Sequence, residues 1–153
     1  MPPAIKPDAP LEGPESSGKP PIRLLFIEDS ENDVLLILHH FRNAGYAPVF
    51  HRVASAAEMR KALEQERWDL ILCDHNLPGF SAQGALHLTR ELALDLPFII
   101  VSGVMQEDEA IAAMRAGAHD YLSKNKLDRL IPAVERELRE VCNRREKHRA
   151  EHT

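Results

Sequence analysis

Short apolar runs alternate with amphipathic stretches along the chain from residue 22 onward. The runs are IRLLFIE (22–28), VFHRV (49–53), LILCD (70–74), PFIIVS (97–102) and the short DYL (120–122). Three of them are apolar almost throughout, a pattern typical of parallel strands that are covered on both faces. We therefore predict a β-strand at each of these positions.

Apolar residues at helical spacing mark the segments that follow the runs. The expected apolar faces are Val34, Leu35, Leu38 and Phe41; Ala57 and Leu63; Leu86, Leu88 and Leu92; Ile111 and Met114; and Leu127, Leu130, Ile131, Val134 and Leu138. Gly45 and Gly117 follow the first and fourth of these segments, and Ser55 is a good N-cap for the second. We therefore predict a helix after each strand.

Repeated strand-then-helix units predict an α/β fold with a parallel sheet and helices on both faces. Right-handed crossovers and a central first strand give a doubly wound, five-stranded parallel sheet of order 2-1-3-4-5. Residues 1–21 are rich in Pro, Gly and Ser and cannot offset their ordering entropy by burial, so we expect a disordered arm there. We place the domain at 22–141 and a charged helix end or linker at 142–153.

Composition narrows the class of protein. The 153 residues are 44% hydrophobic and carry a net charge of −5, so bulk charge draws the chain neither to nucleic acid nor to an anionic membrane. No apolar run approaches the roughly 20 residues that span a bilayer, and we recognise no signal peptide. Cys73 lies in an apolar run and Cys142 in a charged segment, which favours free thiols and a cytoplasmic location.

Polar residues that could catalyse a reaction or bind a ligand follow the predicted strands. Glu28 and Asp29 end the first run, Asp74 ends the third, Ser102 ends the fourth, and Lys124 comes just after the fifth. Because the carboxyl ends of parallel strands meet at one edge, we expect these side chains to converge there. Clustered carboxylates repel one another, and Mg²⁺ is the hard cation that suits such oxygen ligands.

A phosphoryl transfer fits this set of residues. An Asp74 carboxylate oxygen can attack phosphorus and form an acyl phosphate. The metal, Lys124 and the Ser102 hydroxyl can then stabilise the negative charge of the transferring group.

Four sequence motifs closely resemble the receiver domain of two-component response regulators. They are FIEDSENDVLLI, LILCDHNLPGFSAQGAL, IIVSG and AGAHDYLSK, and the match covers residues 22–140. The resemblance implies a flavodoxin-like three-layer sandwich that acts in phosphorelay signalling. The pattern GAHDYLSK…LIPAVEREL further resembles receivers that stand alone or are joined to sensor histidine kinases.

The resemblance also implies a role for each site residue. Asp74 is the phosphoacceptor, Asp29, Asp74 and the backbone carbonyl of Asn76 bind Mg²⁺, and Glu28 acts through a metal-bound water. The donor is a phosphohistidine on a sensor histidine kinase or a histidine phosphotransfer protein. The chain then catalyses only its own phosphorylation and dephosphorylation, and it is not an enzyme for other substrates.

The same resemblance implies a conformational switch. Phosphorylation pulls Ser102 toward the phosphoryl group, Lys124 pairs with it, and Tyr121 turns inward, which reshapes the surface of the fourth helix and fifth strand. No effector domain follows in the sequence, so we expect output through contact with another protein. One departure from the family pattern is Asn125, which stands where the family usually has Pro after the lysine.

Other interpretations of these residues stay open. Glu28-Asp29 also suits a strand-to-helix turn with Ser30 or Asp29 as N-cap, and Tyr121 also suits simple packing. An aspartyl phosphatase or phosphotransferase is a rival, although such enzymes need a second acid where Asn76 stands. A receiver-like scaffold that works without phosphate is the other rival.

The apolar stripe of the last predicted helix also has two interpretations. Ile131, Val134, Leu138 and Val141 are spaced as in a coiled-coil seam. Packing on the sheet explains the stripe, and a homodimer contact is the alternative.

Overall fold

Five parallel strands pair in the order β2-β1-β3-β4-β5 in a computed structural model of the chain, which describes residues 21–75, 77–103 and 106–151. The elements are β1 Pro21–Ile27, α1 Glu31–Asn43, β2 Ala47–Val53, α2 Ala56–Gln65, β3 Leu70–Asp74, α3 Ala82–Glu91, β4 Phe98–Ser102, α4 Glu107–Arg115, β5 Asp120–Ser123, the 3₁₀ turn η2 Leu127–Arg129 and α5 Leu130–Glu151. The predicted α/β class and strand order are confirmed.

Continuous apolar sequence corresponds to strands that are buried on both faces. Every residue of β3 and β4 is buried, and these two strands lie at and beside the middle of the sheet. The edge strand β2 is only partly buried, and it starts at Ala47, two residues before the predicted apolar run at 49. Edge strands need a weaker apolar signal because one side has no neighbouring strand.

Serine N-caps fix where three of the helices begin. Ser30, Ser55 and Ser81 each accept a hydrogen bond from a backbone N–H in the first turn of the following helix, with distances of 3.2, 3.2 and 2.9 Å. Each such cap stabilises a helix by about 1 kcal/mol. The predicted N-cap at Ser55 is confirmed, and Gly45 and Gly117 adopt φ of 93° and 116° after α1 and α4.

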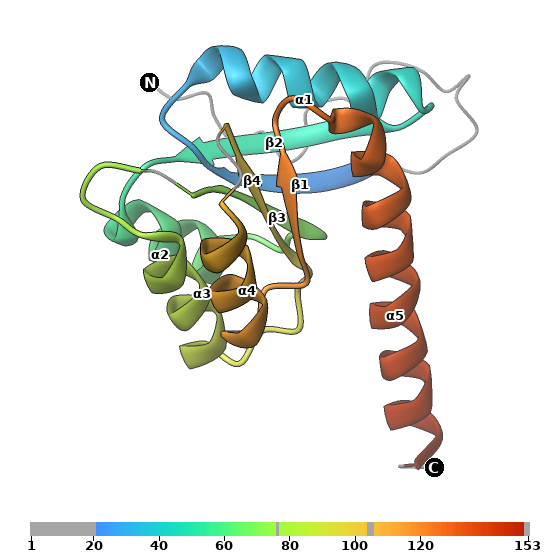
Figure 1. The fold of residues 1–153 in the computed structure, drawn as a ribbon. Helices are drawn as coiled ribbons and strands as arrows, with labels where there is room; N and C mark the ends of the chain where they lie inside the picture. The colour runs from blue at the N-terminus through green and yellow to red at the C-terminus, as the bar shows by residue number, and fades with distance from the viewer. Residues whose placement is uncertain (1–20, 76, 104–105, 152–153) are drawn as a thin grey trace.

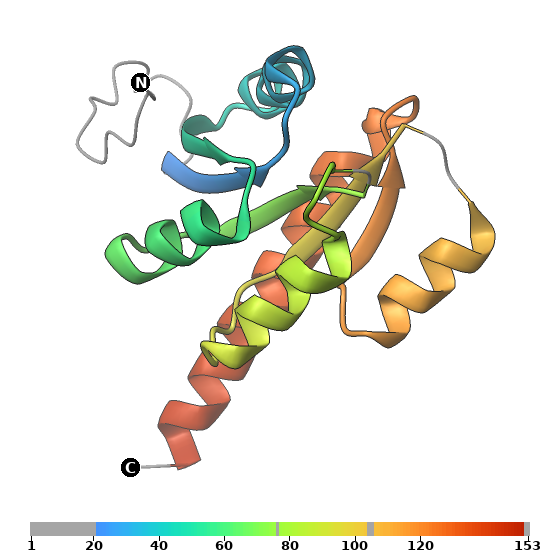
Figure 2. The same cartoon turned by 90° about the vertical axis from the view of Figure 1, so that its left-hand side faces the viewer.

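Helices cover both faces of the sheet (Figures 1 and 2). On one face α1 and α5 cover β1, β3 and β4, with fully buried residues such as Phe26, Leu38 and Leu130. On the other face α2, α3 and α4 pack around a second cluster that contains Met59, Ala85 and Phe98. The sheet therefore has a covered face on each side, and the polar residues of the central strands β3 and β4 lie at the strand ends.

The apolar face expected for the fourth helix is not buried. Ile111 is 45% exposed and Met114 is 44% exposed, whereas Ala113 is the one residue of α4 that is buried. Leu35 of α1 is also exposed, at 53%, although Val34 and Leu38 are buried. The 3.6-residue period shows which residues share a helix face, but it does not show whether this chain covers that face.

Packing against the core buries part of the apolar stripe of α5, and Ile131 and Leu138 are partly buried against the same cluster. Val134 is fully buried and Val141 is 5% exposed. Farther along, Arg144 Nη2 lies 2.8 Å from Asp95 Oδ1, so this part of the helix still contacts the body of the domain.

The ends of the chain were assigned from composition, and the structure describes only part of them. The helix continues to Glu151, which fits a charged helix end, one of the two possibilities expected for 142–153. Most of the arm expected at 1–21 lies outside the described residues, whose first residue, Pro21, starts β1. Among the described residues no helix has the length and apolarity needed to cross a membrane.

Candidate functional site

The carboxyl ends of the strands bring the predicted polar residues to one edge of the sheet. Glu28 directly follows β1, Asp74 ends β3, and Ser102 ends β4. Lys124 follows β5, and its backbone N–H donates to the Ser102 carbonyl at 2.8 Å. Parallel pairing in register is therefore what collects side chains that lie far apart in the sequence.

Three carboxylates form the acidic part of this edge. One oxygen from each of Glu28, Asp29 and Asp74 lies within 4.8 Å of the other two. Glu28 and Asp74 are buried, at 3% and 8% exposed, whereas Asp29 is exposed. Oxygen ligands at this spacing, with one side open to solvent, fit a hard divalent cation such as Mg²⁺. Asn76, expected to add a carbonyl ligand, lies outside the described residues.

Lys124 lies among the carboxylates. Its Nζ is 2.9 Å from Glu28 Oε2, 2.6 Å from Asp33 Oδ2 and 3.4 Å from Asp74 Oδ1. The ammonium thus offsets part of the negative charge that the cluster concentrates. It also links the loop after β5 to the loops after β1 and β3.

Burial changes the proton affinity of this cluster. The pKa of Glu28 is raised to about 7 because its carboxylate is desolvated and lies near Asp74, and the hydrogen bond from Lys124 only partly opposes this rise. Burial alone would lower the pKa of Lys124, but its hydrogen bonds to Asp33 and Glu28 raise that pKa above its ordinary range. The lysine is therefore charged at neutral pH, and the site still holds excess negative charge.

Asp33 belongs to the site, although the sequence pattern does not single it out. It lies in the first turn of α1, and its backbone N–H donates to the Ser30 cap. An acidic residue is common at a helix N-terminus, where negative charge is favourable. The available signal was its position four residues after Asp29, on a helix that starts at the functional edge of the sheet.

The strand-to-helix turn serves two purposes at once. Ser30 caps α1 as the simpler interpretation of this segment expected, and its backbone N–H donates to Glu28 Oε1 at 3.1 Å. The second oxygen of Glu28 accepts from Lys124. A residue of the turn is therefore also a residue of the site.

Ser102 and Tyr121 are both buried beside the acidic edge. Ser102 is fully buried, and Tyr121 is 4% exposed. Burial raises the pKa of Tyr121, an effect that an interaction with Ser102 opposes and that Glu109 and Asp74 reinforce. In this structure the tyrosine ring is thus already inside the domain.

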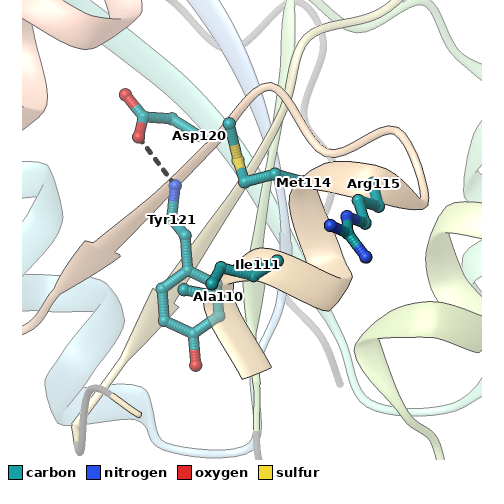
Figure 3. Close-up of a pocket in the computed structure, with 6 residues that line it drawn as sticks. All are labelled: Ala110, Ile111, Met114, Arg115, Asp120 and Tyr121. Atoms are coloured by element: carbon teal, nitrogen blue, oxygen red, sulfur yellow. Dashed lines mark hydrogen bonds between the residues drawn. The ribbon is translucent and has the colours of Figure 1, made fainter. Parts of the chain in front are cut away.

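The Tyr121 ring also forms one wall of an open pocket between α4 and β5 (Figure 3). The pocket has a volume of about 420 Å³, and its other walls include Ile111 and Met114. The exposed apolar residues of α4 therefore face a hollow on the surface.

The loop after β5 departs from the family pattern. The Asn125 backbone N–H donates to Ser123 Oγ at 3.1 Å, and the Lys126 N–H donates to the Ser123 carbonyl at 3.0 Å. A proline at position 125 has no N–H and could not make the first of these bonds. The asparagine thus keeps a local turn that holds Lys124 at the edge of the sheet.

Comparison with known proteins gives the family. A family model for the response regulator receiver domain matches residues 24–135. The transcriptional regulatory protein BaeR of Escherichia coli O6:H1 is 31% identical over 104 residues, which cover 67% of this chain and 41% of BaeR. The chain therefore spans less than half the length of this relative.

Solved structures agree on the fold. The receiver domain of the Francisella response regulator 1452 has a TM-score of 0.67 and 22% identity, and the match covers 78% of this chain and 98% of that one. The receiver domain of sensor histidine kinase PA1611 from Pseudomonas aeruginosa, described with magnesium in its active-site cleft, has a TM-score of 0.59 and 24% identity over 77% of this chain and 98% of that one. This chain belongs to the response regulator receiver domain family.

Proposed function

We propose that the chain accepts a phosphoryl group on Asp74 and signals through the surface of α4 and β5. The observation that carries this proposal is the position of the Lys124 ammonium, 3.4 Å from Asp74 and 2.9 Å from Glu28 at the carboxyl edge of the sheet. An anion that arrives at Asp74 would meet a cation already held beside it. Family membership supports a role in phosphorelay signal transduction.

The three carboxylates of Glu28, Asp29 and Asp74, here called the acidic trio, would hold Mg²⁺. Asp29 and Asp74 would bind the ion directly, Glu28 would act through a bound water, and the Asn76 carbonyl would be a further ligand. The spacing of the three carboxylates supports this assignment. The chemistry that bound Mg²⁺ supplies is neutralisation of clustered charge and polarisation of phosphoryl oxygens. The magnesium described for the PA1611 receiver domain supports the same metal here.

Asp74 would act as the nucleophile. Its carboxylate oxygen forms a bond to phosphorus while the bond from phosphorus to the donor imidazole nitrogen breaks, and the imidazole keeps the electron pair and takes up a proton. Lys124 stabilises the negative charge on the phosphoryl oxygens, and the Ser102 hydroxyl donates to one of them. This last contact would draw the buried Ser102 toward the phosphoryl group and shift the end of β4.

Output would follow from that shift. Burial raises the pKa of the Tyr121 hydroxyl and Ser102 lowers it, so the two side chains lie near one another, and Tyr121 lines the pocket with Ile111 and Met114. A movement of Ser102 therefore changes the packing of Tyr121 and the shape of an exposed apolar surface. A local charge thus shifts the population of a two-state element, and a partner protein reads the result.

The proposal also covers the phosphoryl donor, the bounds of the domain and the cellular location. The donor is a sensor histidine kinase or a histidine phosphotransfer protein, and the receiver domain occupies residues 22–141. The free thiols of Cys73 and Cys142 support a cytoplasmic location. The affiliation with stand-alone or kinase-associated receivers rests on the pattern GAHDYLSK…LIPAVEREL, which spans β5 and the start of α5. BaeR, by its name, is a transcriptional regulatory protein.

Incubation with acetyl phosphate, with and without Mg²⁺, tests the proposal by intact mass. One phosphate should add to the wild-type chain only when Mg²⁺ is present, and none should add to Asp74→Asn. The variant Asp108→Asn removes an exposed acid of α4 and should behave as wild type. Equal mass gain in Asp74→Asn would contradict the proposal and would favour a scaffold that works without phosphate.

A further inference from the structure

His75, the residue directly after Asp74, contacts a residue of α4 and a residue of β5. Its Nε2 is 2.9 Å from Glu109 Oε1 in the first turn of α4. Its ring centroid is 5.6 Å from that of Tyr121, with an angle of 59° between the planes. The side chain is only 18% exposed, so the imidazole is held between α4 and the tyrosine.

Few other described contacts fix the beginning of α4. Its N-cap residue, Gln106, makes no side-chain hydrogen bond to the first turn among the described residues, unlike the serine caps of α1, α2 and α3. Within the helix only Ala113, in the last turn, is buried. Ala110 packs, partly buried, against the core cluster, and the contact from His75 to Glu109 is the described polar contact that adds to it in holding the N-terminal turn of α4 against the domain.

We infer that His75 is a positioning residue that ties α4 to the phosphoacceptor loop. Its backbone is bonded directly to that of Asp74, so a displacement of Asp74 moves the imidazole. Hydrogen bonds weaken steeply when their length or angle departs from the optimum. A small displacement at Asp74 therefore alters the restraint on Glu109, and this route to α4 does not pass through Ser102.

The bond depends on a proton on Nε2 and not on a charged ring. The neutral ring with its proton on Nε2 and the imidazolium both donate to the Glu109 carboxylate. Glu109 also lies in the acidic first turn of α4, where any carboxylate favours the helix N-terminus. The test must therefore separate the specific bond from the general effect of charge.

Amide hydrogen exchange of α4 in the unphosphorylated chain tests the contact itself. His75→Ala and Glu109→Ala should each speed exchange of residues 107–115 by about threefold to tenfold, the loss expected for one hydrogen bond. The double variant should exchange no faster than the faster single variant, because both changes remove the same contact. Glu109→Gln keeps an acceptor oxygen and should restore most of the protection.

The matched control is Glu107→Ala, which removes an exposed carboxylate from the same turn. It changes the helix charge as Glu109→Ala does and should speed exchange by less than twofold. Equal effects of Glu107→Ala and Glu109→Ala, or additive effects in the double variant, would overturn the inference. This arm needs no phosphoryl group.

A second arm tests the link to signalling, which rests on the proposed function. After acetyl phosphate treatment, exchange of α4 is compared at equal phosphorylated fractions, measured by intact mass. Phosphorylation should change α4 exchange in the wild-type chain, and the change should be at least halved in His75→Ala. A change of equal size in both, or no change in wild type, would overturn the link. Failure of the wild type to take phosphate would instead refute the proposed function and leave the first arm decisive for the contact.

Discussion

Lys124 lies closer to Asp33 than to Asp74. The distances from its Nζ are 2.6 Å to Asp33 Oδ2 and 3.4 Å to Asp74 Oδ1. The ammonium is therefore shared between the proposed phosphoacceptor and a carboxylate of α1. In the unphosphorylated domain Asp33 and Glu28 take the hydrogen bonds of Lys124.

We expect Asp33→Asn to lower the free energy of unfolding by about 1 kcal/mol, because a charge-assisted hydrogen bond at a partly exposed site is lost. The variant should still take one phosphate, since Asp74 keeps its place beside Lys124. Chemical denaturation and intact mass measure the two effects. Glu31→Gln, in the same first turn of α1, is the control for helix charge, and an equal loss of stability in it would contradict the assigned role of Asp33.

If the acidic trio binds Mg²⁺, the metal should stabilise the folded chain. Mg²⁺ at ten times its dissociation constant should raise the unfolding free energy of the wild-type chain by about 1.4 kcal/mol. Asp29→Asn removes an exposed ligand with little effect on the core, and it should abolish this stabilisation. Asp33→Asn lies outside the trio and should keep it. Thermal denaturation with and without Mg²⁺ measures the difference, and full stabilisation of Asp29→Asn would show that the trio is not the metal site.

The raised pKa of Glu28 predicts a pH dependence. The ordinary pKa of 4.5 rises to about 7 in the folded chain because of burial first and Asp74 next. The fold therefore favours the protonated carboxyl, and the stability that this group contributes is present below pH 4.5 and lost as pH rises toward 7.

Glu28→Gln cannot ionise and should lack this contribution. Without metal, the stability of Glu28→Gln relative to wild type should rise between pH 5 and pH 8, as measured by urea denaturation at several pH values. Saturating Mg²⁺ favours the carboxylate and should shrink the difference. Parallel pH profiles for the two chains would contradict the assignment.

The backbone hydrogen bond of Asn125 should contribute to the stability of the loop after β5. Asn125→Pro removes the N–H that donates to Ser123 Oγ and should cost about 1 kcal/mol of stability. Asn125→Ala keeps the backbone N–H and should cost less than half as much. Denaturant midpoints compare the two variants. A proline variant as stable as the alanine variant would mean that the turn does not depend on this bond.

Much of the fold follows from the sequence because its signals are local and strong. The runs that form β3 and β4 are apolar at every position before their polar ends, and both strands are buried throughout. Once the strand order is known, the meeting of Glu28, Asp74 and Lys124 follows from parallel pairing. The geometry then agrees with positions expected from residue types alone.

Contacts between elements were harder to predict. Asp33 and His75 look like ordinary residues of a helix start and a loop, and their contacts depend on where a distant lysine and a distant helix lie. The exposure of Ile111 and Met114 depends on what covers α4, which periodicity does not encode. The expected carbonyl ligand at Asn76 stays a prediction.

Chemical mapping of the phosphorylated residue shows directly whether Asp74 is the phosphoacceptor. Borohydride reduces an aspartyl phosphate to homoserine, which marks the modified position for peptide mass spectrometry. After treatment with acetyl phosphate and Mg²⁺, we expect homoserine at Asp74. Homoserine at another aspartate, or a stable phosphate on a hydroxyl or imidazole with none at Asp74, would contradict it.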